Sequence, residues 1–189
     1  MADIWFTSDL HFGHDREFVW KVRGYKDVED MNKQQIEKFN SVVKPEDTVY
    51  ILGDTMLGDN VTGEECLAKL NGHKIMILGN HDTAKRIEIY KKYVDEMVYA
   101  TVIKYKKKVI YLSHYPTLTA SYDDALCSAV LNFHGHTHQT TNFLTGQPHY
   151  YHVGVDSHDG YPVNIDDILA EIKTQAEGYF NFSKKEVVD

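Results

Sequence analysis

Seven side chains of types that bind metal ions occur in five short clusters, and each cluster directly follows an apolar run. They are Asp9, His11, Asp54, Asn80, His114, His136 and His138. Imidazole nitrogens combined with carboxylate and amide oxygens suit transition-metal ions such as Zn, Fe and Mn. Taken one at a time, the first four clusters have simpler explanations, such as a turn, a helix cap or a hydrogen-bonded core histidine. The pair His136 and His138 favours a metal role by itself, because two imidazoles beside a glycine are poorly suited to a core. Their joint occurrence favours a metal site.

The apolar runs before the clusters have the composition of buried β-strands. They are residues 4–7, 49–52, 75–78, 109–112 and 130–133, and they are rich in β-branched and aromatic residues. In open α/β sheets, ligands bind beyond the carboxyl ends of the strands. We therefore expect the five clusters to converge on one edge of the fold.

Helical patterns separate the strands of the first half, and strand patterns dominate the second. Three helices are predicted: one capped by Asp30 and ended by Pro45, one opened by the capping-box pair Thr62 and Glu65 and ended by Gly72, and one from about Ala84 to Tyr93. A hairpin is predicted from runs 97–105 and 109–112, which lysines 106–108 join. Further β-like runs lie at 129–134 and 149–155. A last helix is expected from about Ile165 to Ala176. We expect an α/β fold of two packed sheets with helices outside.

Size and composition restrict the class of protein. With 189 residues, of which 42% are hydrophobic, the chain fits one domain spanning residues 1–189, with a peripheral tail from about residue 177. A net charge of −8 argues against a broad surface for nucleic acid or for anionic membranes. Cys66 and Cys127 show neither disulfide nor metal-site spacing. Because the sequence shows neither a signal-peptide pattern nor a membrane-span pattern, we expect a cytoplasmic protein.

Taken in order, the motifs Asp-x-His, Gly-Asp, Gly-Asn-His-Asp, His and Gly-His-x-His resemble those of the calcineurin-like metallophosphoesterase superfamily. They extend from residue 9 to residue 138, which is most of the chain. The resemblance implies a four-layer α/β/β/α sandwich of two mixed sheets flanked by helices, with a two-metal centre at one sheet edge. It also implies the ligands: Asp9, His11 and His138 for the first metal, Asn80, His114 and His136 for the second, and Asp54 between them.

The implied activity is phosphoester hydrolysis with two divalent or trivalent metal ions, Mn, Fe or Zn, and a metal-bridging hydroxide that attacks phosphorus in line. His81 matches the family's histidine beside the substrate phosphate, a general acid or transition-state stabiliser. Small phosphodiesters are slightly favoured as substrates, because no large insertion separates the motifs. Phosphomonoesterase and nuclease hypotheses share the same site, although the negative charge does not favour nucleic acid. A non-catalytic metal-binding scaffold is the alternative of another class.

The sequence departs from one branch of the family. Protein phosphatases carry an aspartate three residues beyond the bridging one, oriented against the catalytic histidine, and here that position is Leu57. Another group must then orient His81, and Asp82 and Asp59 are the candidates. His14 and Arg16 follow the first cluster, where they either meet a substrate phosphate or belong to an ordinary surface loop. The run 156–159 is also dense in ligand types, but the family pattern requires no ligand there, so we expect it to lie outside the site.

Overall fold

Two mixed β-sheets form the centre of the computed structural model, which describes residues 2–120 and 129–183. The first sheet has the order β4-β3-β2-β1-β9, with strands Glu96–Val98, His73–Ile77, Thr48–Leu52, Ile4–Thr7 and Val163–Asn164. The second has the order β5-β6-β7-β8, with strands Ala100–Tyr105, Lys108–Ser113, Val130–His134 and Tyr150–His152. Within each sheet an antiparallel edge strand, β9 or β5, joins a parallel remainder. The five strands predicted ahead of the clusters are all present, within two residues at either end.

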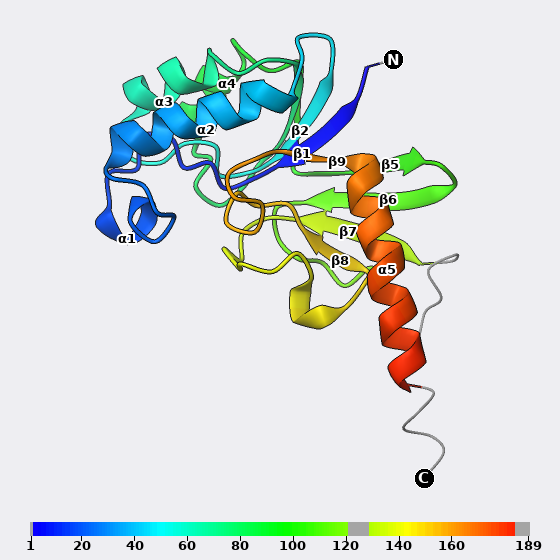
Figure 1. The fold of residues 1–189 in the computed structure, drawn as a ribbon. Helices are drawn as coiled ribbons and strands as arrows, with labels where there is room; N and C mark the ends of the chain where they lie inside the picture. Colours follow the sequence, from blue (N-terminus) through cyan, green and yellow to red (C-terminus); the bar gives the residue numbers. More distant parts are fainter. Residues whose placement is uncertain (1, 121–128, 184–189) are drawn as a thin grey trace.

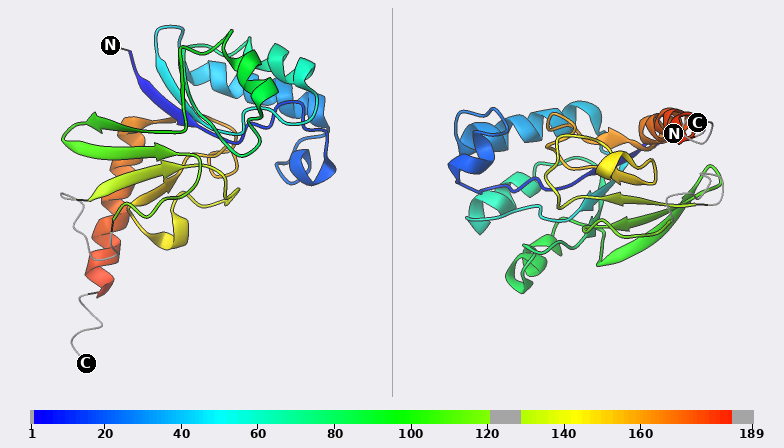
Figure 2. Two further views of the ribbon diagram at one scale, coloured as in Figure 1. Left: turned by 180° about the vertical axis from the view of Figure 1, so that it is seen from behind. Right: turned by 90° about the horizontal axis from the view of Figure 1, so that it is seen from below.

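Helices flank the two sheets, so the predicted α/β architecture is confirmed. The helices are α1 Glu17–Trp20, α2 Val28–Val42, α3 Asn60–Leu67, α4 Ala84–Tyr90 and α5 Ile165–Ser183, with a 3-10 turn at Leu144–Gly146. Figures 1 and 2 show α2, α3 and α4 gathered on the side of the first sheet that faces away from the second sheet. Helix α5 packs Ile165, Ile168 and Ile172 against the core between the sheets. None of the described helices is long and apolar enough to cross a membrane.

The central strand β2 explains why the apolar runs are continuous rather than alternating. Val49 and Ile51 belong to the core under α2, α3 and α4, whereas Leu52 belongs to the core between the two sheets. Both faces of the strand are therefore covered, as is usual for parallel sheets. A strand buried on both faces has little freedom to slip, because a slip of one residue would exchange the two apolar sets. This fixed register places Gly53 and Asp54 just beyond the end of the strand.

The structure confirms the predicted helix starts at Ala84 and Ile165 and corrects the other two. Helix α2 begins after Asp27, whose side chain accepts the backbone N–H of Asp30 at 2.8 Å, so the predicted cap at Asp30 is wrong. Helix α3 begins after Asp59, whose carboxylate accepts the N–H groups of Val61 and Thr62. The capping box that begins at Thr62 is thus also wrong. In both cases an earlier aspartate has the extended backbone that a cap requires.

Other differences concern elements with weak sequence signals. Helix α5 continues to Ser183, seven residues beyond the predicted end, and α4 ends at Tyr90. The run 97–105 divides at Tyr99 into β4, which pairs with β3 in the first sheet, and β5, which forms the predicted hairpin with β6 in the second. Helix α1 and strand β9 were not predicted, and Cys127 lies outside the described residues.

Candidate metal centre

The predicted clusters lie on loops that leave the carboxyl ends of strands from both sheets. Backbone hydrogen bonds join these loops: the N–H of Asp9 donates to Gly53 O, that of His11 donates to Asp54 O, and that of Gly135 donates to His114 O, each at 3.0 Å. A bridge between Ser8 and Gly154 connects the first sheet to the segment after β8. The edges of the two sheets therefore meet at a single place, and all seven predicted residues lie there.

An unusual backbone turns the side chains inward. Five of the seven residues have left-handed φ angles between 48° and 66°: Asp9, His11, Asp54, His136 and His138. Non-glycine residues in this region are uncommon, and they gather at functional sites where the surrounding structure holds them. The loops also come very close together. A Cβ atom on Gly79 would lie 2.3 Å from Asp54 Oδ1, and one on Gly53 would lie 2.4 Å from His114 Nδ1. The glycines of the Gly-Asn and Gly-Asp motifs are thus needed for close approach.

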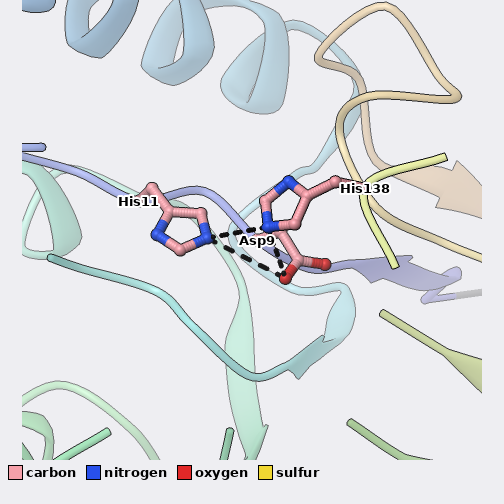
Figure 3. Close-up of side chains that lie close together, drawn as sticks. All are labelled: Asp9, His11 and His138. Carbon is pink, nitrogen blue, oxygen red and sulfur yellow. Dashed lines mark hydrogen bonds and ion pairs between the residues drawn. The ribbon is translucent and has the colours of Figure 1, made fainter. Parts of the chain in front are cut away.

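The first candidate set joins the loop after β1 to the loop after β7. Figure 3 shows the Asp9 carboxylate and the imidazoles of His11 and His138 pointing toward one another. The Nε2 atoms of His11 and His138 are 3.2 Å apart. Asp9 Oδ1 lies 4.0 Å from His11 Nε2 and 3.7 Å from His138 Nε2. Two nitrogens that each lie roughly 2.05 Å from one ion are about 3.3 Å apart at a tetrahedral angle. The spacing of this set is therefore suitable for a shared ion.

The second candidate set is equally close. Asn80 Oδ1 lies 2.9 Å from His114 Nε2 and 2.9 Å from His136 Nδ1. Asp54 stands between the two sets, because its Oδ2 atom is 3.4 Å from His114 Nε2 and 4.0 Å from His11 Nε2. The other oxygen, Oδ1, accepts the backbone N–H of His81 at 2.9 Å. The geometry thus leaves Oδ2 as the Asp54 atom that faces both sets.

Burial and charge in this site fit a cation. Asp9 is fully buried, and its Oδ1 atom has no hydrogen-bond partner among the described residues. A buried carboxylate oxygen is costly without a positive partner, and burial accordingly raises the pKa of Asp9. Burial lowers the pKa of His11 to about 2, which keeps its imidazole neutral and able to bind a metal. Burial opposes ionisation of Asp54 too, but hydrogen bonding and charge from His114 outweigh it and bring the pKa of Asp54 to about 2.

A further carboxylate contacts His138 at Nδ1, the ring nitrogen that faces away from the first candidate set. Asp156 Oδ2 lies 2.8 Å from His138 Nδ1, so our expectation that residues 156–159 lie outside the site is wrong for Asp156. Arg23 donates to both oxygens of Asp156, at 2.8 and 3.0 Å, and to the backbone carbonyl of Asp9 at 2.9 Å. Burial raises the pKa of Asp156, but His138 and Arg23 outweigh this and hold the pKa below its usual range. A carboxylate on the outer nitrogen fixes the tautomer and orientation of a metal-binding imidazole.

The sequence contained a signal for Asp156 but not for Arg23. Asp156 follows the β-like run 149–155, as the other clusters follow theirs, and only the family pattern argued against it. Arg23 lies in the loop after α1, where no periodicity or ligand motif marks it. Its contacts with Asp156 span 133 positions of the chain, so only the folded structure reveals them.

His81 lies at the open side of the site, with Nε2 4.0 Å from Asp54 Oδ2 and its side chain 43% exposed. The candidates for orienting it are engaged elsewhere. Asp82 accepts the N–H groups of Asp54 and Gly79 and the hydroxyl of Tyr90, and Asp59 caps α3. The His14 ring lies 5.6 Å from that of His11, beside the first set. Arg16 is exposed at the start of α1.

Replacing Asp156 by asparagine should weaken metal binding by the first set about 10–100-fold, because the imidazole of His138 loses its anionic partner and Arg23 keeps an unpaired charge. Competition with a chromophoric chelator measures the dissociation constant. Asp159→Asn is the matched control, since its side chain is 89% exposed three residues further along. Equal affinities for the Asp156→Asn protein and the unmodified protein would show that Asp156 does not support the site.

Comparisons with known proteins agree with the geometry. A family model described as calcineurin-like phosphoesterase matches residues 2–186. An uncharacterized protein of Methanocaldococcus jannaschii is 33% identical over 184 residues, which cover 92% of this chain and 93% of that protein. The crystal structure of a protein of unknown function from Aquifex aeolicus is similar with a TM-score of 0.68 and 28% identity, covering 89% of this chain and 98% of that one. The names of these two proteins assign no activity, so information on the reaction comes from the family.

Proposed function

Because the chain belongs to the calcineurin-like phosphoesterase family, we propose that it hydrolyses phosphoesters at a two-metal centre built by the seven predicted side chains. Metal-dependent phosphoester hydrolysis is the activity that this membership implies. The observation that carries the two-metal proposal is the position of Asp54, whose Oδ2 atom faces His11 of one set and His114 of the other. Metal ions bound there would supply an activated water and neutralise charge on the phosphoryl oxygens.

The chain's own groups have separable tasks in this proposal. Asp9, Asp54 and His114 are buried and form the floor of the site, whereas Asn80 and His138 are exposed and form its rim. A phosphoester can therefore approach only from the rim side, where the half-exposed imidazole of His81 stands. From that position His81 would donate a proton to the leaving oxygen or stabilise the charge on it. The negative net charge of the chain leaves the attraction of an anionic substrate to the metal centre.

We favour small phosphodiesters over monoesters as substrates. In the described ranges 2–120 and 129–183, the loops that carry the seven residues hold no added domain that would close over a substrate. The rim is correspondingly open, so a second substituent on phosphorus can extend beyond it. Mn, Fe and Zn all suit the mixed nitrogen and oxygen ligands.

A substrate panel tests this function. Phosphomonoesters, linear diesters, cyclic nucleotides and a single-stranded oligonucleotide are assayed with Mn²⁺, Fe²⁺ or Zn²⁺, after dialysis against chelator. We expect turnover only in the presence of metal, with the highest kcat/KM for small diesters. Salt-sensitive cleavage of the oligonucleotide alone would favour a nuclease instead. Two bound metals with no turnover of any phosphoester would contradict hydrolysis and favour the scaffold hypothesis.

A further inference from the structure

An apolar cavity of about 320 Å³ adjoins the first candidate set. His11 and His138 line it together with Phe18 and Val19 of α1 and Val22 of the following loop. Phe18 is 70% exposed and Val22 is 80% exposed. Large apolar side chains that remain exposed to water contribute little to the stability of the fold. Exposed apolar patches beside a candidate catalytic centre mark binding sites.

Aromatic rings connect the metal site to this cavity. The His11 ring lies 5.0 Å from that of His138 and 5.6 Å from that of His14. The His14 ring in turn meets the Phe18 ring edge to face, with centroids 6.0 Å apart and planes at 90°. The wall that leads outward from the candidate ligands is thus continuous and formed largely of flat rings. A planar group can stack on such a wall or meet it edge to face.

The charges in the cavity do not favour a second phosphate. Arg23 and Asp156 both line the cavity, but the Arg23 guanidinium makes two hydrogen bonds to the Asp156 carboxylate and their charges cancel. Asp156 also accepts from His138, so its oxygens are occupied. A cavity whose guanidinium is already paired offers more to an apolar group than to an anion.

We propose that the phosphoester substrate carries an aromatic ring that packs in this cavity against Phe18 while its phosphorus lies at the metal centre. This inference rests on the proposed function and adds the class of substrate to it. The volume is adequate, because an apolar cavity of about 150 Å³ binds benzene. A single ring or a fused pair of rings therefore fits the 320 Å³ available.

Binding of two phosphonates that cannot be hydrolysed at the C–P bond tests the proposal. Isothermal titration calorimetry on the Mn²⁺-loaded protein compares benzylphosphonate with methylphosphonate, which differ only in the ring. We expect benzylphosphonate to bind at least about tenfold more tightly, because the ring leaves water for an apolar wall. Phe18→Ala should weaken benzylphosphonate about tenfold and leave methylphosphonate unchanged, since only the ring reaches this wall. Val22→Ser should act in the same direction.

Tyr99→Ala is the matched control, because Tyr99 is an aromatic residue that is 78% exposed at the crossover between the sheets. It should change neither affinity. Equal affinity for the two phosphonates would overturn the aromatic substrate while leaving phosphoester hydrolysis intact, and would leave Phe18 and Val22 as a surface for another macromolecule. Failure of both phosphonates to bind, together with no turnover in the substrate panel, would overturn the proposed function and this inference with it.

Discussion

Replacing Asp54 by asparagine should reduce kcat/KM on the order of 10³-fold or more, and the bound metal should fall from the two ions per chain of the proposed centre to one or none. The change is small in size, because asparagine keeps an oxygen that can still accept the His81 N–H. What it removes is the negative charge at Oδ2, the atom that faces both candidate sets. An amide oxygen or nitrogen at that position cannot neutralise two cations at once.

Metal content and rate should therefore fall together in Asp54→Asn. Elemental analysis gives the stoichiometry, and steady-state kinetics on the best substrate of the panel gives kcat/KM. Asp95→Asn is the control, since its carboxylate is 61% exposed just before β4, at the opposite end of the sheet from the candidate ligands. Two tightly bound metals in Asp54→Asn, with normal turnover, would contradict the role of Asp54 between the two sets.

The local sequence was sufficient to predict the strands and the convergence of the clusters. A run such as 49–52 is apolar throughout because both faces of β2 are covered, and a glycine and a polar residue then mark its end. Given five such runs, the rule that sites lie beyond strand ends brings the clusters to one edge. The convergence follows from the topology that open α/β sheets share.

Other features depend on contacts between distant parts of the chain. The switch at Tyr99 from one sheet to the other could not be predicted, because β4 and β5 form one continuous β-like run in the sequence. The left-handed backbone of Asp9 and His11 is held by hydrogen bonds to the loop after β2. The role of Arg23 could not be predicted from the sequence for the same reason, since its hydrogen-bond partners come from the loops after β1 and β8. Secondary-structure propensity depends on the residues of one segment, whereas these features depend on tertiary contacts between segments.

The structure also shows how the catalytic candidate is held without an Asp-His pair. Both backbone polar groups of His81 are hydrogen-bonded. Its N–H donates to Asp54 Oδ1, and its carbonyl accepts from Arg86 Nη1. Asp82, in the same loop, accepts the N–H of Gly79 and also that of Asp54 in the loop after β2. A fixed main chain therefore places the imidazole beside Asp54, and its half-exposed ring remains free to reach a substrate.

His81→Ala should lower kcat on the order of 10²–10³-fold while leaving two metals bound, because the proposed ligands are untouched and only the proton donor or charge stabiliser is lost. Metal analysis and kinetics on the same preparation measure both quantities. His73→Ala is the matched control, since this histidine of β3 has a side chain 65% exposed and, among the described residues, its ion pair is with Asp95. Unchanged kcat in His81→Ala, with metal retained, would remove His81 from the mechanism.

The leaving group then distinguishes the two roles of His81. If the imidazole donates a proton to the leaving oxygen, His81→Ala should lose most of its rate on alkyl esters, whose alkoxides need that proton, and little on p-nitrophenyl esters, whose phenolate departs unaided. If the imidazole instead stabilises charge on the phosphoryl oxygens, the loss should be equal for both leaving groups, because those oxygens are common to them. We expect the unequal pattern, since His81 stands at the open rim where a leaving group must depart.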